Sequence, residues 1–210
     1  MEGTKTFPSD VAFTPAVKAV QARKGSRKIY ERVENGEGWS TEITPDLRAF
    51  LGEQRSFFLA TANAEGHPYI QHRGGPKGFL RVIDEHTLGF ADFRGNRQYI
   101  SIGNLAENPK VHLFLIDYAH QRRIKIWGEA RVVEGEDDPA LLARLTPAGY
   151  AAKPERAFVI TLAAWDANCP QHIPQMIAAE DVAAAIGERD RRIADLEAQV
   201  KRLETGPTGV

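Results

Sequence analysis

The sequence predicts a mainly β fold with flanking helices, in the form of an antiparallel barrel or sandwich. Short apolar runs bounded by Gly, Pro or acidic turns recur between residues 56 and 166. Helix signals lie only between and beyond these runs, so the pattern lacks the regular strand–helix alternation of a parallel sheet. The chain has 210 residues, of which 42% are hydrophobic and 26% charged. This length and composition suit one good-sized folded domain with appendages.

Residues 1–45 are predicted to form a helical and extended segment ahead of the strands. The run PAVKAVQARKG, residues 15–25, indicates a short helix closed by Gly25. The run KGSRKIYERVENGEGW, residues 24–39, is polar and rich in turn formers, and predicts a loop. Thr44 and Pro45 then provide the N-cap and first residue of a helix through DLRAFLGEQ, residues 46–54.

The strand-like runs begin at Ser56. They are SFFLATAN (56–63), YIQHRGG (69–75), FLRVID (79–84), TLGFADF (87–93), VHLFLIDY (111–118), RRIKIWGEARVVE (122–134) and RAFVITLAAWD (156–166). Between them, GNRQYISIGNLAENP (95–109) indicates a helix-like connector, and DDPALLARLTPAGYAAK (137–153) a short helix and loop. In the run 122–134, alternation places Ile124 and Ile126 inward.

Residues 176–205 indicate a separate amphipathic helix. Ile186, Ile193, Leu196, Val200 and Leu203 recur at three-and-four spacing, and Glu and Arg fill many of the positions between them. A lone helix with so narrow an apolar stripe is marginal in water. Two interpretations follow: the helix packs on its own domain, or it forms a short coiled coil with a second subunit.

Charge and cysteine content exclude several classes of protein. The formal net charge is −1 and the pI about 6.6, which disfavours a nucleic-acid binder driven by bulk electrostatics. Cys169 is the only cysteine, so an intramolecular disulfide and a CxxC metal site are excluded. The N-terminal segment lacks the apolar stretch of a signal peptide, and no run is long enough to span a bilayer. We therefore expect a cytoplasmic protein that binds no membrane.

Three basic segments indicate a binding site for an anion. The run HRGGPKGFLRV, residues 72–82, combines Arg73, Lys77 and Arg81 with glycines, including Gly78, that let backbone amides approach a ligand. The run GNRQ, residues 95–98, places Asn96, Arg97 and Gln98 where a strand gives way to a probable helix start, a common phosphate cradle. Arg122 and Arg123 open a third basic segment. The alternative is that all these cations are ordinary solvated surface charges.

No catalytic constellation stands out. The six histidines show neither HxxxH nor HExxH spacing, so no metal site is expected. Cys169 and His172 lie three residues apart in NCPQHI, a spacing that invites a nucleophile interpretation. Because nothing else supports thiol chemistry, a structural or ligand-lining role for Asn168, Gln171 and His172 is the preferred hypothesis.

Four motifs together resemble a known family. FFLATANAEGHPYIQ, FLRVIDEHTLGFADFRGNRQ, NLAENPKVHLFLIDY and RRIKIWGEARVVE occur in the order seen in the pyridoxamine 5′-phosphate oxidase-like FMN-binding split barrels. The runs QHRGGPKGF and NCPQHI resemble an uncharacterised flavin-nucleotide-binding branch of that family. The resemblance covers roughly residues 46–175. It implies a six-stranded antiparallel split β-barrel that works as a homodimer, with FMN bound at the subunit interface.

The resemblance also implies contacts for individual residues. Arg81 falls on the basic residue that contacts FMN at the end of a strand, and the segment before it lines the flavin through its backbone. Arg97 and Gln98 match an Arg-Lys pair that grips the phosphate, with Gln98 departing from the pattern. Arg123 takes the place of a flavin-contacting Gln. The complete set of expected cofactor-binding residues is Arg73, Lys77, Gly78, Phe79, Leu80, Arg81, Asp92, Asn96, Arg97, Gln98, Arg123, Asn168, Gln171 and His172.

The C-terminal region departs from the family pattern. Pyridoxamine phosphate oxidases end in a Trp- and Arg-rich segment that binds the substrate phosphate, whereas this chain has NCPQHI and a charged helix. The resemblance therefore implies an FMN-dependent oxidoreductase with another small-molecule substrate. Two alternatives stay open: a flavin-binding or carrier protein without turnover, and the same barrel using a deazaflavin or haem, with His72 or His172 as the axial ligand of a haem.

Overall fold

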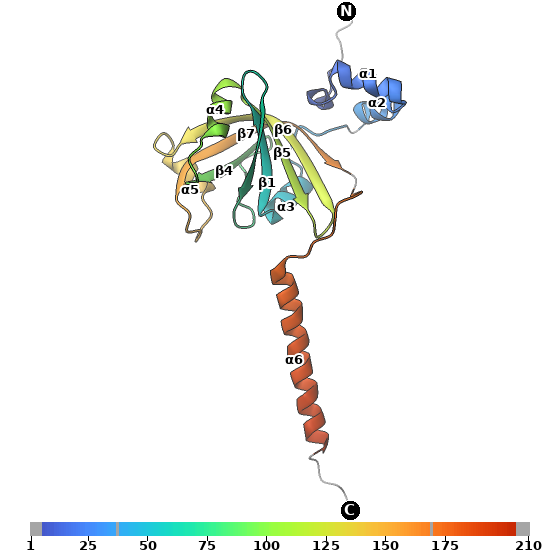
Figure 1. The fold of residues 1–210 in the computed structure, drawn as a ribbon, viewed down its shortest axis with the longest axis vertical. Coiled ribbons are helices and arrows are strands. Elements are labelled where there is room, and N and C mark those ends of the chain that lie inside the picture. Colours follow the sequence, from blue (N-terminus) through green and yellow to red (C-terminus); the bar gives the residue numbers. More distant parts are fainter. Residues whose placement is uncertain (1–5, 37, 169, 205–210) are drawn as a thin grey trace, which may run out of the picture. The chain divides into compact units, whose positions relative to one another are not determined.

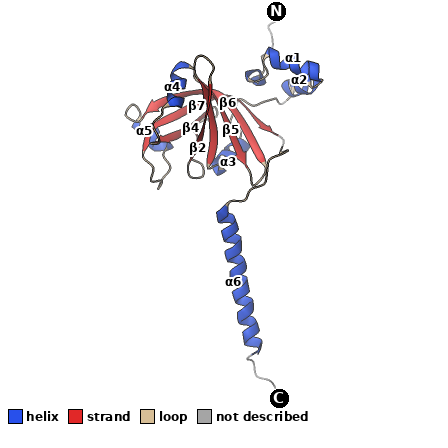
Figure 2. Cartoon of the chain, viewed as in Figure 1, coloured by secondary structure: helices blue, strands red, loops and turns tan. Residues whose placement is uncertain are grey.

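The computed structural model describes residues 6–36, 38–168 and 170–204, which fall into two compact units. The first unit holds residues 6–117 and 123–168, and the second holds residues 118–122 and 170–204. The helices are η1 (Pro8–Val11), α1 (Pro15–Lys24), α2 (Arg27–Asn35), α3 (Pro45–Glu53), α4 (Ile100–Glu107), α5 (Pro139–Leu145) and α6 (Ala179–Glu204) (Figure 1). The strands are β1 (Ser56–Ala62), β2 (Pro68–Gly74), β3 (Arg81–Val82), β4 (Thr87–Phe93), β5 (Lys110–Asp117), β6 (Arg122–Glu134) and β7 (Pro154–Asn168) (Figure 2).

The helix starts expected from the sequence are present, but one predicted loop is a helix. Thr44 caps α3 by accepting the Leu47 amide at 3.2 Å, and Gly25 ends α1 in the left-handed conformation. The loop prediction for residues 24–39 was wrong, because α2 occupies most of that run. Its polar residues stabilise the helix: Arg27 contacts both Glu31 and the buried Glu34, one and two turns further on.

All strands belong to one sheet in the order β2-β1-β5-β6-β7-β4-β3, with antiparallel neighbours wherever the register is defined. The mainly β, antiparallel prediction is confirmed, but the expected six strands are seven. The additional strand is short: of the run FLRVID, only Arg81 and Val82 pair with β4, at Gly89 and Leu88. Phe79 and Leu80, which precede them, turn inward and are each 2% exposed.

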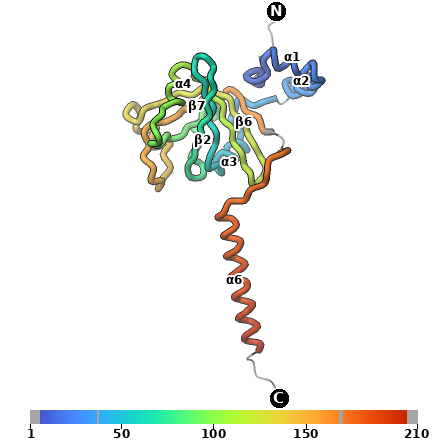
Figure 3. The backbone as a smooth tube through the Cα atoms, in the orientation of Figure 1, coloured from blue at the N-terminus to red at the C-terminus, as the bar shows by residue number. Residues whose placement is uncertain are grey.

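The sheet curls into an open barrel (Figure 3), and aromatic side chains form part of its core. Three strands lie between β1 and β4 in the sheet, yet Phe57 of β1 and Phe90 of β4 contact each other with ring centroids 5.3 Å apart. Phe90 also stacks on Phe158 of β7 at 5.0 Å, and Phe57 on Phe79 at 5.6 Å. In the described part of the chain no backbone ladder joins β2 to β4. We call this gap, bounded by Arg73 on β2 and Asp92 on β4, the seam.

A shared carboxylate closes the seam through side chains. Asp92 accepts a hydrogen bond from Arg73 Nη1 at 2.5 Å and another from Arg156 Nη1, on β7, at 3.2 Å. The three side chains are only 11–12% exposed. The Arg73 guanidinium also lies 4.9 Å from the ring centroid of Phe158, within cation–π range. Burial lowers the pKa of Arg73 and Asp92 opposes this, but a guanidinium keeps its charge in proteins.

The outer face of β5 and β6 carries a second aromatic cluster. Trp39, from the N-terminal segment, stacks on Trp127 of β6 at 4.7 Å, and His112 of β5 contacts the Trp127 ring at the same distance. The Lys125 ammonium lies 5.6 and 5.3 Å from the Trp39 and Trp127 ring centroids. The N-terminal segment is therefore attached to the barrel through stacked rings.

A β-bulge lets the last strand, β7, also contact the N-terminal segment. The register of β6 against β7 shifts between Trp127 and Gly128, and a Cβ at Gly128 would overlap the carbonyl oxygen of Thr161. Beyond this shift, Trp165 changes face and packs against the barrel core, as expected when one residue is inserted into a strand. Its Nε1 donates to Glu42 O at 2.8 Å, and its backbone pairs with Ser40.

In the second unit, two segments are held together by backbone and amide contacts. The turn of residues 118–122 meets the segment after residue 169: Gln121 Nε2 donates to Ile173 O at 2.6 Å, and the Met176 amide donates to Tyr118 O at 3.3 Å. The rest of this unit is α6.

We expect Asp92→Asn to destabilise the protein by about 2–4 kcal/mol, somewhat below the cost of breaking a fully buried ion pair. The substitution removes the charge that Arg73 and Arg156 share across the seam: Arg156 keeps Glu134 and Glu155, whereas Arg73 loses the one carboxylate that contacts it among the described residues. Urea denaturation followed by tryptophan fluorescence measures the change. Glu53→Gln, which breaks the exposed Lys77–Glu53 pair, is the matched control and should have a much smaller effect. Equal stability of Asp92→Asn and the wild type would exclude a role for the carboxylate in closing the seam.

The structure also predicts a loss of stability in acid that depends on His112. Burial, and secondarily the charge of Lys125, lower the pKa of His112 below its usual 6.5. As the pH falls below about 6.5, His112 becomes protonated in the unfolded chain but stays neutral in the folded chain. The free energy of unfolding then falls, with a limiting slope of about 1.4 kcal/mol per pH unit for one proton.

Urea titrations between pH 7.5 and 5 test this expectation. His112→Gln should flatten the pH dependence relative to the wild type. His67→Gln, at an exposed histidine in the β1–β2 turn, should leave it as it is. If the free energy of unfolding changed with pH equally in the wild type and in His112→Gln, His112 would not be the cause of the acid destabilisation.

Candidate functional site

A cleft of about 250 Å³ opens beside the seam. Three side chains along nearly the whole of β2 form its floor, namely Tyr69, Gln71 and Arg73, which share a face because strand residues alternate. The end of β4, the loop of residues 94–99, the first turn of α4 and the start of β7 complete the walls. The lining therefore comes from three stretches of the sequence, residues 69–73, 92–102 and 155–156, that the curled sheet brings together.

The loop of residues 94–99 turns sharply above this floor. Arg97 and Tyr99 adopt left-handed backbone conformations, with φ of 59° and 55°. Asn96 Oδ1 accepts the Gln98 amide at 3.2 Å, a local turn of the kind asparagine favours. Among the described residues, Arg97 has no carboxylate partner. It is thus a guanidinium in the cleft wall that is free to bind a ligand.

The first turn of α4 presents backbone amides to the cleft. The first intrahelical bond runs from the Gly103 amide to Tyr99 O at 2.9 Å, so the amides of residues 100–102 precede the helical ladder. Such amides, together with the helix dipole, favour an anion. Ser101 Oγ donates to Gln71 at 3.0 Å, and Asn104 donates to Thr61 at 3.0 Å, which fixes the helix on β2 and β1.

Arg156 organises the opposite wall. Its Nε donates to both Glu134 oxygens at 3.0 and 3.1 Å, and its Nη1 donates to Asp92 and to Glu155. Burial would lower the pKa of Arg156, but the hydrogen bonds to Glu134 and Asp92 outweigh it and raise the pKa. Its guanidinium lies 5.4 Å from the Tyr99 ring centroid. Both carboxylates of the cleft, Asp92 and Glu155, are therefore already engaged by arginine.

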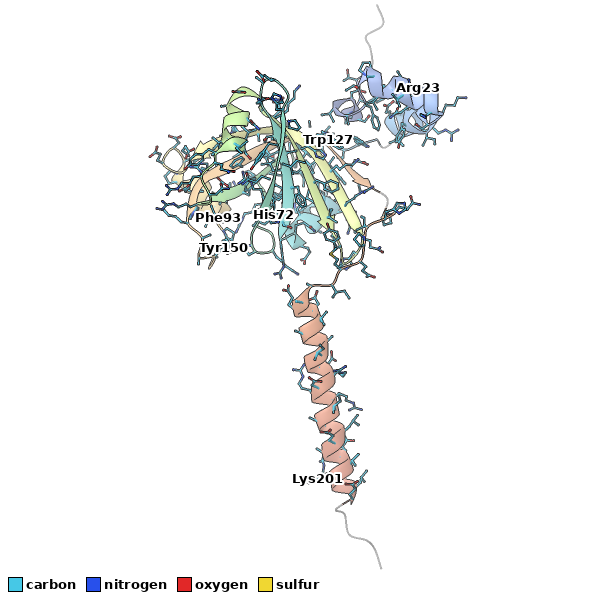
Figure 4. The ribbon with its side chains drawn as sticks, in the orientation of Figure 1. Arg23, His72, Phe93, Trp127, Tyr150 and Lys201 are labelled. Carbon is cyan, nitrogen blue, oxygen red and sulfur yellow. The ribbon has the colours of Figure 1, made fainter. Side chains whose placement is uncertain are left out.

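A smaller cavity of about 160 Å³ shares Arg73, Asp92 and Phe93 with the cleft. Its other walls come from the end of β2 and from the rings of Phe79 and Phe90. The Arg73 Nε is buried there and has no hydrogen-bond partner in the protein. Phe93 packs on Tyr150 with ring centroids 5.1 Å apart (Figure 4). Arg73 thus stands between an open cationic cleft and a more aromatic recess.

The structure brings together one group of the predicted site residues. The cleft is lined by Arg73, Asp92, Asn96, Arg97 and Gln98. They belong to two of the three basic segments recognised in the sequence, and to the strand end between them. Phe79 reaches the smaller cavity beside Arg73, although its side chain belongs mainly to the core.

The glycine-rich turn after β2 serves internal packing. A Cβ at Gly75 would lie 2.7 Å from the Phe79 ring, and one at Gly78, where φ is 71°, would lie 3.2 Å from Gly52 O. Lys77 pairs with Glu53 at 2.8 Å, on the exposed surface beside α3. These glycines let the turn pack tightly, and the side chains of residues 77–80 do not line the cleft.

The remaining predicted residues lie elsewhere. Arg81 is exposed on the short strand β3, and Arg123 stands opposite Asn168 on β6 with its Nε buried. Gln171 and His172 are exposed residues of the second unit. The side chain of Asn168 and all of Cys169 lie outside the described residues.

Sequence reasoning missed most of the cleft's uncharged lining, one of its carboxylates and one central cation. The missed residues are Tyr69, Gln71, Phe93, Gly95, Tyr99, Ile100, Ser101, Ile102, Glu155 and Arg156. Alternation along β2 from Arg73 would have found Gln71 and Tyr69. Arg156 had no comparable signal, because its role follows from the register that pairs it with Asp92.

Two further properties of the described residues bear on function. No group of three or more His, Cys, Asp and Glu side chains among them could hold a metal ion. None of the helices they form combines the length and apolar character needed to traverse a bilayer.

Three solved structures are similar to the chain in outline. An FMN-binding protein from Syntrophomonas wolfei is 13% identical, with a TM-score of 0.46 over 73% of this chain and 95% of that one. A protein named F420 reductase is 22% identical, with a TM-score of 0.41 over 59% and 98%. The haem storage protein HutZ from Vibrio cholerae is 18% identical, with a TM-score of 0.36 over 57% and 89%. At these values none of the three indicates what this chain binds.

Comparison by sequence is more decisive. No curated protein matches the chain. Residues 43–169, which span the barrel from the start of α3 to the end of β7, match the family model described as pyridoxamine 5′-phosphate oxidase. This match covers more than half of the chain, so the protein belongs to the pyridoxamine 5′-phosphate oxidase family.

Proposed function

We propose that the protein is an FMN-dependent oxidoreductase and that the cleft beside the seam holds the FMN phosphate. The observation that carries the proposal is the meeting of the unpaired Arg97 guanidinium with the free amides of the first turn of α4. Guanidinium and helix-terminal amides are the donors that bind phosphate in proteins. Family membership adds independent support, since the resemblance implies FMN in this type of barrel.

The residues present fit the two ends of FMN. Arg97, Asn96 and Gln98 would bind the phosphate together with the amides of residues 100–102. Tyr99 and Ile100, which are 48% and 39% exposed, offer apolar surface for the flat ring or its linker. A second subunit would cover these exposed side chains, in keeping with an FMN site at a homodimer interface.

Bound FMN would supply the capacity to accept and return electrons. The chain's own residues would orient it and tune its electronics. Arg73 is the cation best placed for tuning, because it lines both cavities and holds a buried Nε without a partner. A cation beside the reduced flavin stabilises its anionic form and raises its potential.

A second candidate function is that of a flavin-binding or carrier protein without turnover. It is favoured by the engagement of both cleft carboxylates, Asp92 and Glu155, with Arg156. No histidine or cysteine lines the cleft among the described residues, so a proton would come from a hydroxyl such as that of Tyr69 or Tyr99, or from the substrate, solvent or a second subunit.

We expect Arg97→Ala to weaken FMN binding by about 1–3 kcal/mol, the usual loss for one charge-assisted contact. Quenching of flavin fluorescence in titrations of the full chain measures the dissociation constant. Arg23→Ala, at an arginine of α1 that does not line the cleft, is the matched control and should bind FMN like the wild type (Figure 4). Equal affinity of the Arg97 and Arg23 variants would move the phosphate away from this loop.

Turnover separates the two candidate functions. For the oxidoreductase, we expect NADH or NADPH to bleach the absorbance of bound flavin under anaerobic conditions, and air to restore it. A flavin that stays oxidised with both nicotinamides, yet is reduced by dithionite, would favour the carrier. A chain whose melting temperature does not respond to saturating FMN would contradict both, and deazaflavin and haem would be the next ligands to test.

A further inference from the structure

The sequence of helix α6 follows one heptad register without interruption, and its a and d positions form a mostly apolar stripe. Counted from Ala179 as position a, every a residue is apolar, and the d residues are Val182, Arg189, Leu196 and Leu203. The a residues are Ala179, Ile186, Ile193 and Val200. β-branched residues at a with Leu at d form the combination that favours parallel two-stranded coiled coils.

Within the single chain this stripe is fully available. No described residue of α6 is buried, and its large apolar side chains are between 42% and 82% exposed (Figure 4). Gly187 lies in the helix interior, where glycine costs about 1 kcal/mol relative to alanine. A helix of this composition draws most of its stability from packing of its apolar face. The stripe therefore requires a partner.

The flanking charges identify that partner as a second copy of α6 in parallel orientation. The e positions are Ala183, Asp190, Glu197 and Glu204, and the g positions are Ala185, Arg192 and Gln199, so the charged e residues are all acidic and the charged g residue is basic. In a parallel pair, each g residue faces the e residue five positions on in the other helix, so Arg192 meets Glu197 of the second copy twice. In an antiparallel pair the e positions face one another, which would oppose carboxylates without a cation.

One layer departs from the apolar pattern. Arg189 occupies a d position near the middle of the helix, and its guanidinium lies 3.7 Å from Asp190, the adjacent e residue. A single polar core residue lowers the stability of a coiled coil but fixes its register, because any shift would bury the charge against an apolar layer. The in-register arrangement avoids such burial, because it places Arg189 and Asp190 of one helix at the same level as Arg189 and Asp190 of the other.

We propose that α6 pairs with α6 of a second copy as a parallel, in-register coiled coil. None of the residues that line the cleft belongs to α6, and the pairing joins two subunits whether or not the cleft binds a flavin. It also assigns a function to the charged C-terminal helix that replaces the family's Trp- and Arg-rich ending.

Disulfide trapping in the full chain tests the pairing directly. In a Cys169→Ser background, Leu203→Cys places a thiol at the last d position, and Ala198→Cys places one at position f on the opposite face. Positions 182 and 203 are about 30 Å apart along a helix, so only parallel chains bring two Leu203→Cys thiols together. We expect the dimer to form at least about tenfold faster at 203 than at 198, since a disulfide needs Cα atoms within about 7 Å.

Two results would overturn the proposal. Equal rates at 203 and 198 would exclude a coiled coil, and preferential linkage of Val182→Cys to Leu203→Cys in a mixture would make the pair antiparallel. All three tryptophans lie outside α6, so their fluorescence shows independently whether each variant keeps a folded barrel.

A charge exchange tests the register with the same assay. Arg192→Glu in the Leu203→Cys chain should slow disulfide formation about threefold to tenfold, because it turns two attractive contacts into repulsive ones. Adding Glu197→Arg should restore the rate, because the exchanged pair is again complementary. If the doubly substituted chain formed the disulfide as slowly as the Arg192→Glu chain, this register would be excluded.

Discussion

The Asp92 carboxylate is the interaction on which the rest of the barrel depends. The edge strands of the sheet are β2 and β3, and among the described residues no backbone ladder joins β2 to β4, the neighbour of the short β3. Asp92 supplies the missing connection, because it binds one arginine from each side of the gap. The aromatic core behind it is closed on this side by the guanidinium of Arg73, lying over the Phe158 ring. At this gap, side-chain contacts of one carboxylate hold β2 against β4, whereas backbone hydrogen bonds hold the other neighbouring strands together.

The same carboxylate explains why cations can gather in the cleft. Arg73, Arg97 and Arg156 all line it, and their mutual repulsion would disfavour the fold without a counter-charge. Asp92 and Glu155 neutralise the arginines that have structural roles, which leaves Arg97 for a ligand. The site is thereby assembled before any ligand arrives, and little reorganisation is needed to bind an anion.

The sequence predicted the strands and helix starts well where local chemistry decides them, as with the Thr44 cap and the alternation around Ile124. It grouped Asn96, Arg97 and Gln98, which line the cleft together, because they are neighbours in the chain. It failed where position in space decides: Arg156 becomes a site residue only through its register with Asp92. The glycines after β2 suggested a ligand, but they make room for the Phe79 ring and the backbone of Gly52.

The bulge beside Gly128 has a consequence for how the molecule unfolds. Because the bulge shifts the register of β7, Trp165 packs against the barrel core while its indole N–H donates to the Glu42 carbonyl in the N-terminal segment. The segment cannot detach without breaking that bond and uncovering the ring of Trp127, on which Trp39 lies. Opening of the N-terminus is therefore coupled to the core, and the two belong to one cooperative unit.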